Sequence, residues 1–513
     1  MFKVLLPILF ALGATGCSSL TDDLDDLGGV RQSAEFAIPL VDSEVDLTDL
    51  LGSVDERFLL TVDPDGLLRF RYSDTVPPVT SETIFADLRE LGRGIPLPIT
   101  ERDTRLPFPL PNRASIDLAR LGAGRLTYVL PNPYDQPVRL TLRLTNFLNN
   151  DAVATITGEL PAYSGSGDRP TLTNAGAPLD LAGYVLNFSD EELRIEYSID
   201  ALDGTPLKPG PGTVLLLSDL EFSYLEGYFG QLPYPGVDDQ LAIDFFENYL
   251  SGDVTFVDPR IVVQVRSSVG VPARAVVESL NVETADGRRI PVEGEIVDEG
   301  FRFDYPREPG DNATTTYVVD KENSNLLDLL EARPVALNYR ISAQINPDAD
   351  PTQTGFLSDT NSYAATVTLE LPLYGSARDF EVTDTLPVNL GEQYGEVTAA
   401  TFRVTTDSDL PLDLLLSGTF VDSLGSPVAD LTDGELLIME ASETDPSGTP
   451  LGTVRATNDI PITGEALTRI RQARSLVLTT SFATLDGGTR PVRITNEQTL
   501  RVRIGARLTL EQP

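Results

Sequence analysis

The stretch VRLTLRLT, residues 138–145, decides the fold class of this chain. Val138, Leu140, Leu142 and Leu144 alternate with arginine and threonine, so every second side chain is apolar. A β-strand turns successive side chains to opposite faces of its sheet. The spacing therefore predicts a strand with one buried face and one solvated face.

The same alternation recurs at residues 193–199, 363–371 and 500–504. Sheets with one solvated face are typical of antiparallel sandwiches and barrels, whereas parallel sheets are buried on both faces. Glycine and proline punctuate these runs as turns require. We expect an all-β, mostly antiparallel fold of several β-sandwich-like units in tandem with a few short helices.

Several segments have the spacing of a short helix that is followed by a strand. They are residues 43–52, 116–128, 245–256, 325–339 and 466–479. In the fourth segment Ser324 is a candidate N-cap, and the helix must have ended before Pro334. We expect these helices to plug the open ends of sandwiches with buried leucines, with partner binding as the alternative.

The chain length of 513 residues exceeds the size at which one hydrophobic core stops growing, so two to four domains are expected. From the positions of the turn residues and of the N-terminal features described below, we place a signal peptide at 1–16 and a lipidated cysteine with an acidic tether at 17–33. We place β domains at 34–150, 151–245, 246–385 and 386–513.

Two absences in the composition exclude many kinds of site. The chain has no histidine, and Cys17 is its only cysteine. Catalytic Ser-His-Asp and Cys-His groups are therefore excluded, as are ordinary zinc, haem and iron–sulfur sites and intrachain disulfides. We expect no catalytic residue, no resident metal and no cofactor.

The charge balance is strongly acidic, with 78 Asp and Glu against 38 Lys and Arg, a formal net charge of -40. Such a surface repels the phosphates of nucleic acids and of anionic lipids. We therefore expect no nucleic-acid partner, and any attachment to a membrane must use something other than a basic patch.

The first 17 residues, MFKVLLPILFALGATGC, have the features of an export signal. Lys3 precedes an apolar run, residues 4–12, that is too short to span a bilayer. Ala14-Thr15-Gly16-Cys17 then resembles a lipobox, which implies that a diacylglyceryl group is attached to the thiol of Cys17. A plain signal peptide followed by a free cysteine is the alternative.

Residues 18–33 are polar and carry four aspartates within five positions, Asp22, Asp23, Asp25 and Asp26. We expect a flexible tether. The acidic cluster is similar to those of surface-exported lipoproteins of the Bacteroidetes. Lipid anchoring in the outer membrane is therefore expected; the cell surface is favoured and the periplasmic face stays open.

Two wider resemblances point the same way. Residues 37–51, 243–282, 296–306 and 367–380 look like a family of large Bacteroidetes lipoproteins without an assigned function. A strand–turn–Pro–strand layout at 124–142, 251–277 and 394–416 is similar to β-sandwiches of the late-embryogenesis-abundant type-2 kind. The first resemblance implies an envelope lipoprotein and supplies no active site.

Three local features of the sequence are candidate sites. The Asp-rich turns VDPDG, residues 62–66, and NPDADPTQTG, residues 346–355, offer oxygen ligands for calcium, although turn formation alone explains them. Paired carboxylates could hydrolyse glycosides if they lay about 5 to 10 Å apart. The basic run RVRIGAR, residues 501–507, alternates, so its arginines are expected on a solvated strand face where they can pair with acidic groups.

These observations favour a non-enzymatic, lipid-anchored envelope protein with a structural, scaffolding or macromolecule-binding role. Its expected partners are the membrane, through the lipid on Cys17, and an unidentified envelope protein, glycan or lipid. A carrier of lipid or another apolar ligand is the first alternative, and a carboxylate-based hydrolase is the second.

Overall fold

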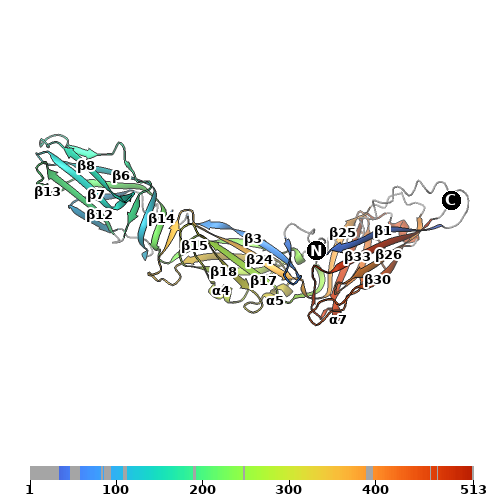
Figure 1. Ribbon diagram of the computed structural model, residues 1–513. Helices are drawn as coiled ribbons and strands as arrows, with labels where there is room; N and C mark the ends of the chain where they lie inside the picture. Colours follow the sequence, from blue (N-terminus) through green and yellow to red (C-terminus); the bar gives the residue numbers. More distant parts are fainter. Residues whose placement is uncertain are drawn as a thin grey trace.

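The computed structural model describes residues 34–46, 58–81, 85, 94–107, 113–188, 192–246, 249–388, 397–462, 464–470 and 472–510. Within these residues the protein consists of three β-sandwich modules arranged in a row (Figure 1). We call them the terminal, middle and distal modules. The expected all-β architecture of several sandwich units with few short helices is confirmed.

The terminal module contains both the first and the last described strands. One of its sheets has the order β1 (Ala34–Asp46), β33 (Thr499–Leu510), β26 (Val397–Ser408) and β30 (Val454–Ile462). The other has the order β16 (Tyr249–Phe256), β25 (Tyr374–Pro387), β31 (Ser475–Thr484), β27 (Leu412–Val421) and β28 (Pro427–Asp430), with β29 (Leu436–Met439) on β27 and β32 (Val492–Arg493) on β25.

The middle module is built from two five-stranded sheets. One has the order β2 (Phe58–Val62), β3 (Leu68–Thr80), β24 (Ser362–Pro372), β17 (Arg260–Ser267) and β21 (Ala313–Val319). The other has the order β15 (Leu232–Ala242), β22 (Pro334–Ile345), β18 (Ala273–Thr284) and β19 (Arg289–Pro291), with β20 (Phe301–Phe303) on β18. Tyr234 and Tyr363 join the two sheets through an edge-to-face contact with centroids 4.8 Å apart.

The distal module is a single twelve-stranded sheet that folds over on itself. Its main path is β13 (Pro206–Leu207), β12 (Glu192–Ala201), β7 (Val138–Asn149), β11 (Val185–Asn187), β6 (Ser115–Pro131), β14 (Val214–Tyr228) and β23 (Gly355–Ser358). The remaining strands are β4 (Ile95–Pro98) on β14, β5 (Asp103–Pro107) on β12, β8 (Ala152–Leu160) on β7, and β9 (Thr171–Thr173) and β10 (Leu179–Asp180) on β6.

The quoted stretch lies in β7 and behaves as its alternation predicts. Leu140, Leu142 and Leu144 have almost no exposed surface, while Arg139 and Arg143 on the opposite face are exposed. Burial of each leucine contributes about 1.5–3 kcal/mol. The long pairings in all three modules are antiparallel, as expected from sheets with one solvated face.

The segments that build the distal module are inserted in the sequence between segments of the middle module, and those in turn lie between segments of the terminal module. It begins in the terminal module with β1, passes through the middle module in β2 and β3, builds the distal module, and returns through the middle module to the terminal module. Two strands interrupt this return: β16 pairs with β25 of the terminal module before the chain re-enters the middle module, and β23 pairs with β14 of the distal module before β24. The chain therefore passes between neighbouring modules several times. One of these connections is a single residue, Leu373, between β24 and β25.

The sheets do not follow the consecutive domains expected from the sequence. Residue 150 lies in the turn of the β7–β8 hairpin, residue 245 lies in a 3-10 helix (Asp244–Phe246), and residue 385 lies inside β25. Strands between 34 and 150 enter all three modules. Turn residues show where a strand ends, but they do not show which distant strand it pairs with. They therefore could not predict that segments of one module lie between segments of another in the sequence.

The expected helices are confirmed in part. The helix-then-strand order holds at α5 (Leu326–Glu331) before β22 and at α6 (Gly464–Ile470) before β31, and the 245–256 segment has one 3-10 turn before β16. The helix expected at 116–128 is wrong, because that segment is part of β6. Shifts of register against β14 interrupt its alternation and give the apolar residues a helix-like spacing.

Helix α5 plugs the core as expected, with Leu326, Leu329 and Leu330 buried. Its N-cap is Asn325 rather than Ser324, although the Ser324 hydroxyl accepts a hydrogen bond from the Leu326 N–H at 3.3 Å. The described residues also contain α4 (Glu295–Glu299) and α7 (Leu485–Gly488), which the sequence did not indicate. Of the segment 43–52, residues 43–46 end β1 and the rest lies outside the described residues.

The three segments compared with late-embryogenesis-abundant sandwiches do not occupy equivalent places. Residues 251–277 supply β16, β17 and the start of β18, which belong to three different sheets. Residues 394–416 supply β26 and the start of β27, whereas residues 124–142 stay within the distal sheet. The repeated strand–turn–Pro–strand pattern is therefore a local similarity of turns and not a repeated domain.

Candidate functional site

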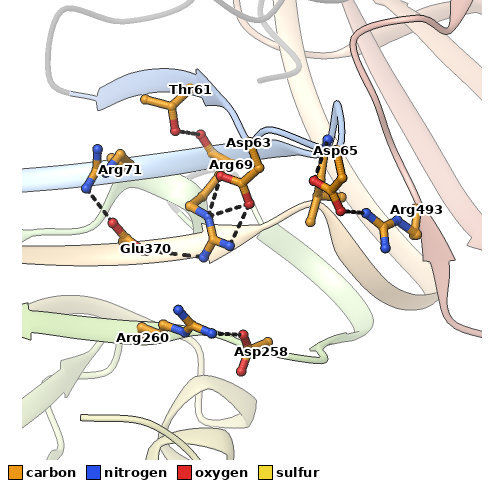
Figure 2. Close-up of polar contacts among 10 residues, drawn as sticks. Thr61, Asp63, Asp65, Arg69, Arg71, Asp258, Arg260, Glu370 and Arg493 are labelled. Atoms are coloured by element: carbon orange, nitrogen blue, oxygen red, sulfur yellow. Dashed lines mark hydrogen bonds and ion pairs between the residues drawn. The ribbon is translucent and has the colours of Figure 1, made fainter. Parts of the chain in front are cut away.

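A group of six charged residues, of which Arg69 and Glu370 are buried, lies where the middle and terminal modules meet (Figure 2). We call it the junction cluster. Its members are Asp63, Asp65, Arg69, Arg71, Glu370 and Arg493. They come from the turn between β2 and β3, from β3, from β24 and from β32.

Local sequence explains the turn that positions the two aspartates. In Asp63-Pro64-Asp65-Gly66 the Asp63 carbonyl accepts a hydrogen bond from the Gly66 N–H at 2.9 Å, and Gly66 has a φ of 83° that glycine adopts without strain. The turn docks on the terminal module through backbone hydrogen bonds from Leu68 N–H to the Ile494 carbonyl and from Asn496 N–H to the Gly66 carbonyl, each 3.0 Å.

Arg69 is the centre of the cluster. Its side chain is 11% exposed and lies between two carboxylates: Nη2 is 2.8 Å from Asp63 and Nη1 is 3.4 Å from Glu370. The other oxygen of Glu370 is 2.5 Å from Nη2 of Arg71. Burial by itself would lower the pKa of Arg69, but the hydrogen bond to Asp63 and the surrounding carboxylates raise it above its ordinary value.

Asp65 and Arg493 connect the two modules directly. They form an ion pair between the β2–β3 turn and β32, and the Arg493 guanidinium also lies 5.5 Å from the ring centroid of Tyr374 in β25. The hydrogen bond to Arg493 lowers the pKa of the Asp65 carboxyl, although the small desolvation of this group opposes the shift. The pair therefore acts as a charged clamp across the junction.

The chemistry of the cluster is that of a structural lock. Each carboxylate contacts a guanidinium, and none of the six side chains is a hydroxyl, thiol or amine nucleophile. The little-exposed Arg69 and Glu370 contact each other and the more exposed Asp63 and Arg71, so that two arginines and two carboxylates balance their charges. A buried charge pair with matched hydrogen bonds holds one arrangement and penalises any movement that separates the partners.

No sequence motif marks this cluster as a whole. The Asp-rich turn marks Asp63 and Asp65 as calcium candidates, whereas no motif marks Arg69, Glu370 or Arg493. A signal was present: Arg69 follows Leu67 and Leu68 and precedes Phe70, and Glu370 lies between Leu369 and Leu371. A single charge inside an apolar run predicts a buried charge that needs a partner.

The oxygens of both Asp-rich turns are used by protein groups. Asp63 and Asp65 contact the arginines just described. In the second turn Asp348 makes two hydrogen bonds with Arg302, at 2.6 and 2.5 Å, and Asp350 accepts hydrogen bonds from the N–H and hydroxyl of Thr352 at 2.9 and 2.7 Å. These contacts lower the pKa of both carboxyls, and turn formation accounts for the two motifs.

The basic run at 501–507 lies on β33, with Val502 and Ile504 buried beneath it. Arg501 makes two hydrogen bonds with Asp42 of β1, at 2.9 and 3.0 Å, and Arg503 is 2.5 Å from Asp407 of β26. The predicted alternation and the pairing with acidic groups are both confirmed. The run therefore strengthens the contact between neighbouring strands of the terminal module.

An apolar pocket lies beside the junction cluster. It is lined mainly by side chains of the terminal module together with Phe245 and Leu373, and its volume is about 80 Å³. Sites for drug-sized ligands have volumes of roughly 300–1,000 Å³. The pocket is therefore too small for an acyl chain, and it gives no support to the lipid-carrier alternative.

Cys17, the expected lipidation site, lies outside the described residues together with the expected signal peptide and tether. Among the helices that the structure does describe, none is long and apolar enough to cross a membrane. The lipid anchor therefore stays a prediction from the sequence.

Comparisons with known proteins add little to this picture. No family model matches the chain, and no curated protein matches it. Among solved structures, one described as a "putative secreted protein" from Parabacteroides distasonis is 13% identical and covers 54% of this chain and 82% of its own, with a TM-score of 0.25. Two infectious bursal disease virus structures, 8% and 11% identical, each cover 89% of this chain and 82% of their own, with TM-scores of 0.13 and 0.15.

Parabacteroides belongs to the Bacteroidetes, the group of the lipoproteins that the sequence resembles. The similarity to late-embryogenesis-abundant sandwiches finds no counterpart among these matches. At TM-scores this low the structures do not share one overall arrangement with this chain, so they contribute no argument about its function.

Proposed function

We propose that this chain is a non-enzymatic, lipid-anchored envelope protein, which holds its distal module away from the membrane on a rigid β stalk. The observation that carries the proposal is the position of Ala34. It is the first described residue after Cys17, and it lies at the end of the row of modules opposite to the distal module.

The register of the strands establishes this position. Asp46 of β1 pairs with Thr499, close to the junction with the middle module, where Leu67 bridges Thr495. Ala34 pairs with Leu510 at the opposite end of the same strands. In the distal module β14 starts at Val214 and ends at Tyr228 just before β15 of the middle module, so the β12–β13 turn near Leu202 lies at the outer end (Figure 1).

Strand lengths give the scale of the stalk. Strands β33, β18 and β14 have 12, 12 and 15 residues and run along the row of modules (Figure 1). At about 3.3 Å per residue, three such strands end to end span on the order of 120 Å. An anchor at one end would therefore place the distal module far outside the bilayer surface.

The joints support a rigid stalk because each module is tied to its neighbour in several ways. The middle and terminal modules share four chain crossings, the junction cluster and the backbone hydrogen bonds of the β2–β3 turn. Strand β23 lies at the other joint: it pairs with β14, and Phe356 within it bridges Gly270 of the middle module. A flexible linker between domains would have only one crossing.

The proposal includes lipidation at Cys17, location at the outer membrane with display at the cell surface favoured, and a scaffolding or macromolecule-binding role for the exposed modules. The envelope partner, whether protein, glycan or lipid, is not identified by the site. The lipobox resemblance and the acidic segment after Cys17 support the location.

The test measures the height of two positions above a bilayer. The full lipidated chain, carrying Leu202→Cys or Leu424→Cys with a fluorescent label, is reconstituted in vesicles that contain an acceptor lipid. Both leucines are well exposed, and Leu424 lies in the β27–β28 turn at the Ala34 end. We expect strong energy transfer from position 424 and almost none from position 202. Equal transfer from both would contradict the stalk, and failure of the chain to bind vesicles would contradict the anchor.

A further inference from the structure

Strand β8 forms an open edge in the distal module. Its nine residues, Ala152–Leu160, pair with β7 on one side, and no described strand pairs with them on the other. The N–H and C=O groups on that outer side are available to a further strand. The edge is at the part of the molecule that the stalk holds farthest from Ala34.

Two other long edges among the described strands, β30 and β15, carry features that block strand addition. Strand β30 is also nine residues long, but it carries Arg455, Asp459 and Pro461. Strand β15 carries two prolines and an Asp-Asp pair, and its register against β22 shifts between Tyr234 and Val237. Strand β8 reads AVATITGEL, with no proline, no lysine and Glu159 as its only charge, so it lacks the usual devices that block pairing.

The apolar face under this edge is incompletely covered. The register with β7 places Ala154, Ile156, Gly158 and Leu160 on the core side, opposite the fully buried Leu144, Leu142, Leu140 and Val138. Ile156 and Leu160 are only partly buried, although they pack against the core, and so is Leu172 of β9, which covers Gly158. A strand added beside β8 would cover Ile156 further.

The opposite face of the edge is nearly neutral, despite the acidic surface of the chain. Arg139 pairs with Glu159 at 2.8 Å and Arg143 with Glu196 at 2.9 Å, while Thr155 and Thr157 are exposed and uncharged. A second copy with the same net charge can therefore approach this edge without bringing unpaired carboxylates together.

We propose that the β8 edge pairs with the β8 edge of a second copy of this chain, in antiparallel register about Ile156. A symmetric contact uses the same surface on both subunits, and the sequence of β8 is self-complementary about this residue. Ile156 lies opposite its own counterpart, Thr155 lies opposite Thr157, and Ala154 lies opposite Gly158. Glu159 lies opposite Val153, so the contact places no like charges together.

The pairing joins two distal sheets into one continuous sheet, and it does not depend on the lipid anchor. A nine-residue strand pair is a small interface, so we expect weak association in solution. Confinement of both copies to one membrane would raise their effective concentration and strengthen the pairing without any new contact.

The test uses two charge variants of the full chain, kept in detergent, whose association is measured by sedimentation velocity over a range of concentrations. In T155E/T157E, glutamates face each other twice across the seam. In T155E/T157K, a glutamate faces a lysine twice. Both variants carry T155E, which places a carboxylate opposite Arg143 of the same chain, so their folding is matched, and circular dichroism verifies it.

We expect the dissociation constant of T155E/T157E to exceed that of T155E/T157K by about tenfold or more, because two cross-strand pairs change from repulsive to attractive. Thr457→Glu on the protected edge β30 serves as the control and should leave association unchanged. A wild-type chain that stays monomeric at every concentration, or equal behaviour of the two charge variants, would overturn the proposal. Loss of binding to a different protein in T155E/T157E, with the chain itself monomeric, would overturn it too.

Discussion

Replacement of Glu370 by glutamine tests whether the junction cluster stabilises the joint between the middle and terminal modules. Glu370 is 8% exposed and accepts contacts from two guanidinium groups, at 3.4 Å from Arg69 and 2.5 Å from Arg71. Loss of one partner from a buried pair destabilises a protein by about 3–5 kcal/mol. Arg71 is 40% exposed, and glutamine keeps one acceptor, so we expect a loss of about 2–3 kcal/mol.

The assay is urea unfolding followed by tyrosine fluorescence, since the chain has 16 tyrosines and no tryptophan. Asp459→Asn is the matched control, because its pair with Arg403 lies on an exposed face and should contribute at most about 1 kcal/mol. Equal unfolding midpoints for Glu370→Gln and Asp459→Asn would refute the reasoning.

Three further predictions concern single sites. A carbon-13 NMR titration should show a pKa of about 2 for Asp286, because hydrogen bonds from the Thr284 hydroxyl and then from Arg288 stabilise its carboxylate. The contribution of these hydrogen bonds to the stability of the fold is present above the ordinary pKa of the carboxyl and is lost as the pH falls through 2. A midpoint near 3.8 would contradict this prediction. Leu329→Ala removes a side chain from the buried face of α5 and should lower the free energy of unfolding, measured by urea titration, by about 2–5 kcal/mol. A loss below about 1 kcal/mol, as for an exposed residue, would show that α5 does not fill the core. Gly252→Ala should lower the midpoint temperature of thermal unfolding, because Gly252 has a φ of 91° and an added Cβ would lie 1.9 Å from the Asp379 carbonyl oxygen. An unchanged midpoint in calorimetry would contradict this prediction.

Alternation was enough to predict the strands that have one buried face. The periods at 138–144, 193–199 and 500–504 correspond to β7, β12 and β33, because each of these strands packs one face on a core and exposes the other. The same rule fails at 116–128, where irregular pairing with β14 shifts the side chains between faces. A local pattern cannot distinguish a bulged strand from a helix when the partner strand is about one hundred residues away.

The junction cluster could be predicted only in part for the same reason. The turn at 62–66 is local, and its residues specify it. One of the two partners of Arg69, Glu370, lies 301 residues away in the sequence, and the partner of Asp65, Arg493, lies 428 residues away. Those separations come from the nested chain path, which no turn signal records. Charged residues inside apolar runs show that partners are needed, without showing which residues provide them.

The stalk proposal depends on a covalent anchor at the Ala34 end of the molecule. The most direct test is intact-mass and peptide mass spectrometry of the chain purified from the membranes of its own cells. The account predicts a mature polypeptide that begins at Cys17, with acyl groups on that residue and none on a Cys17→Ala variant, which should leave the membrane fraction. A mature chain with a free thiol at Cys17, or one that begins at another residue, would contradict the account.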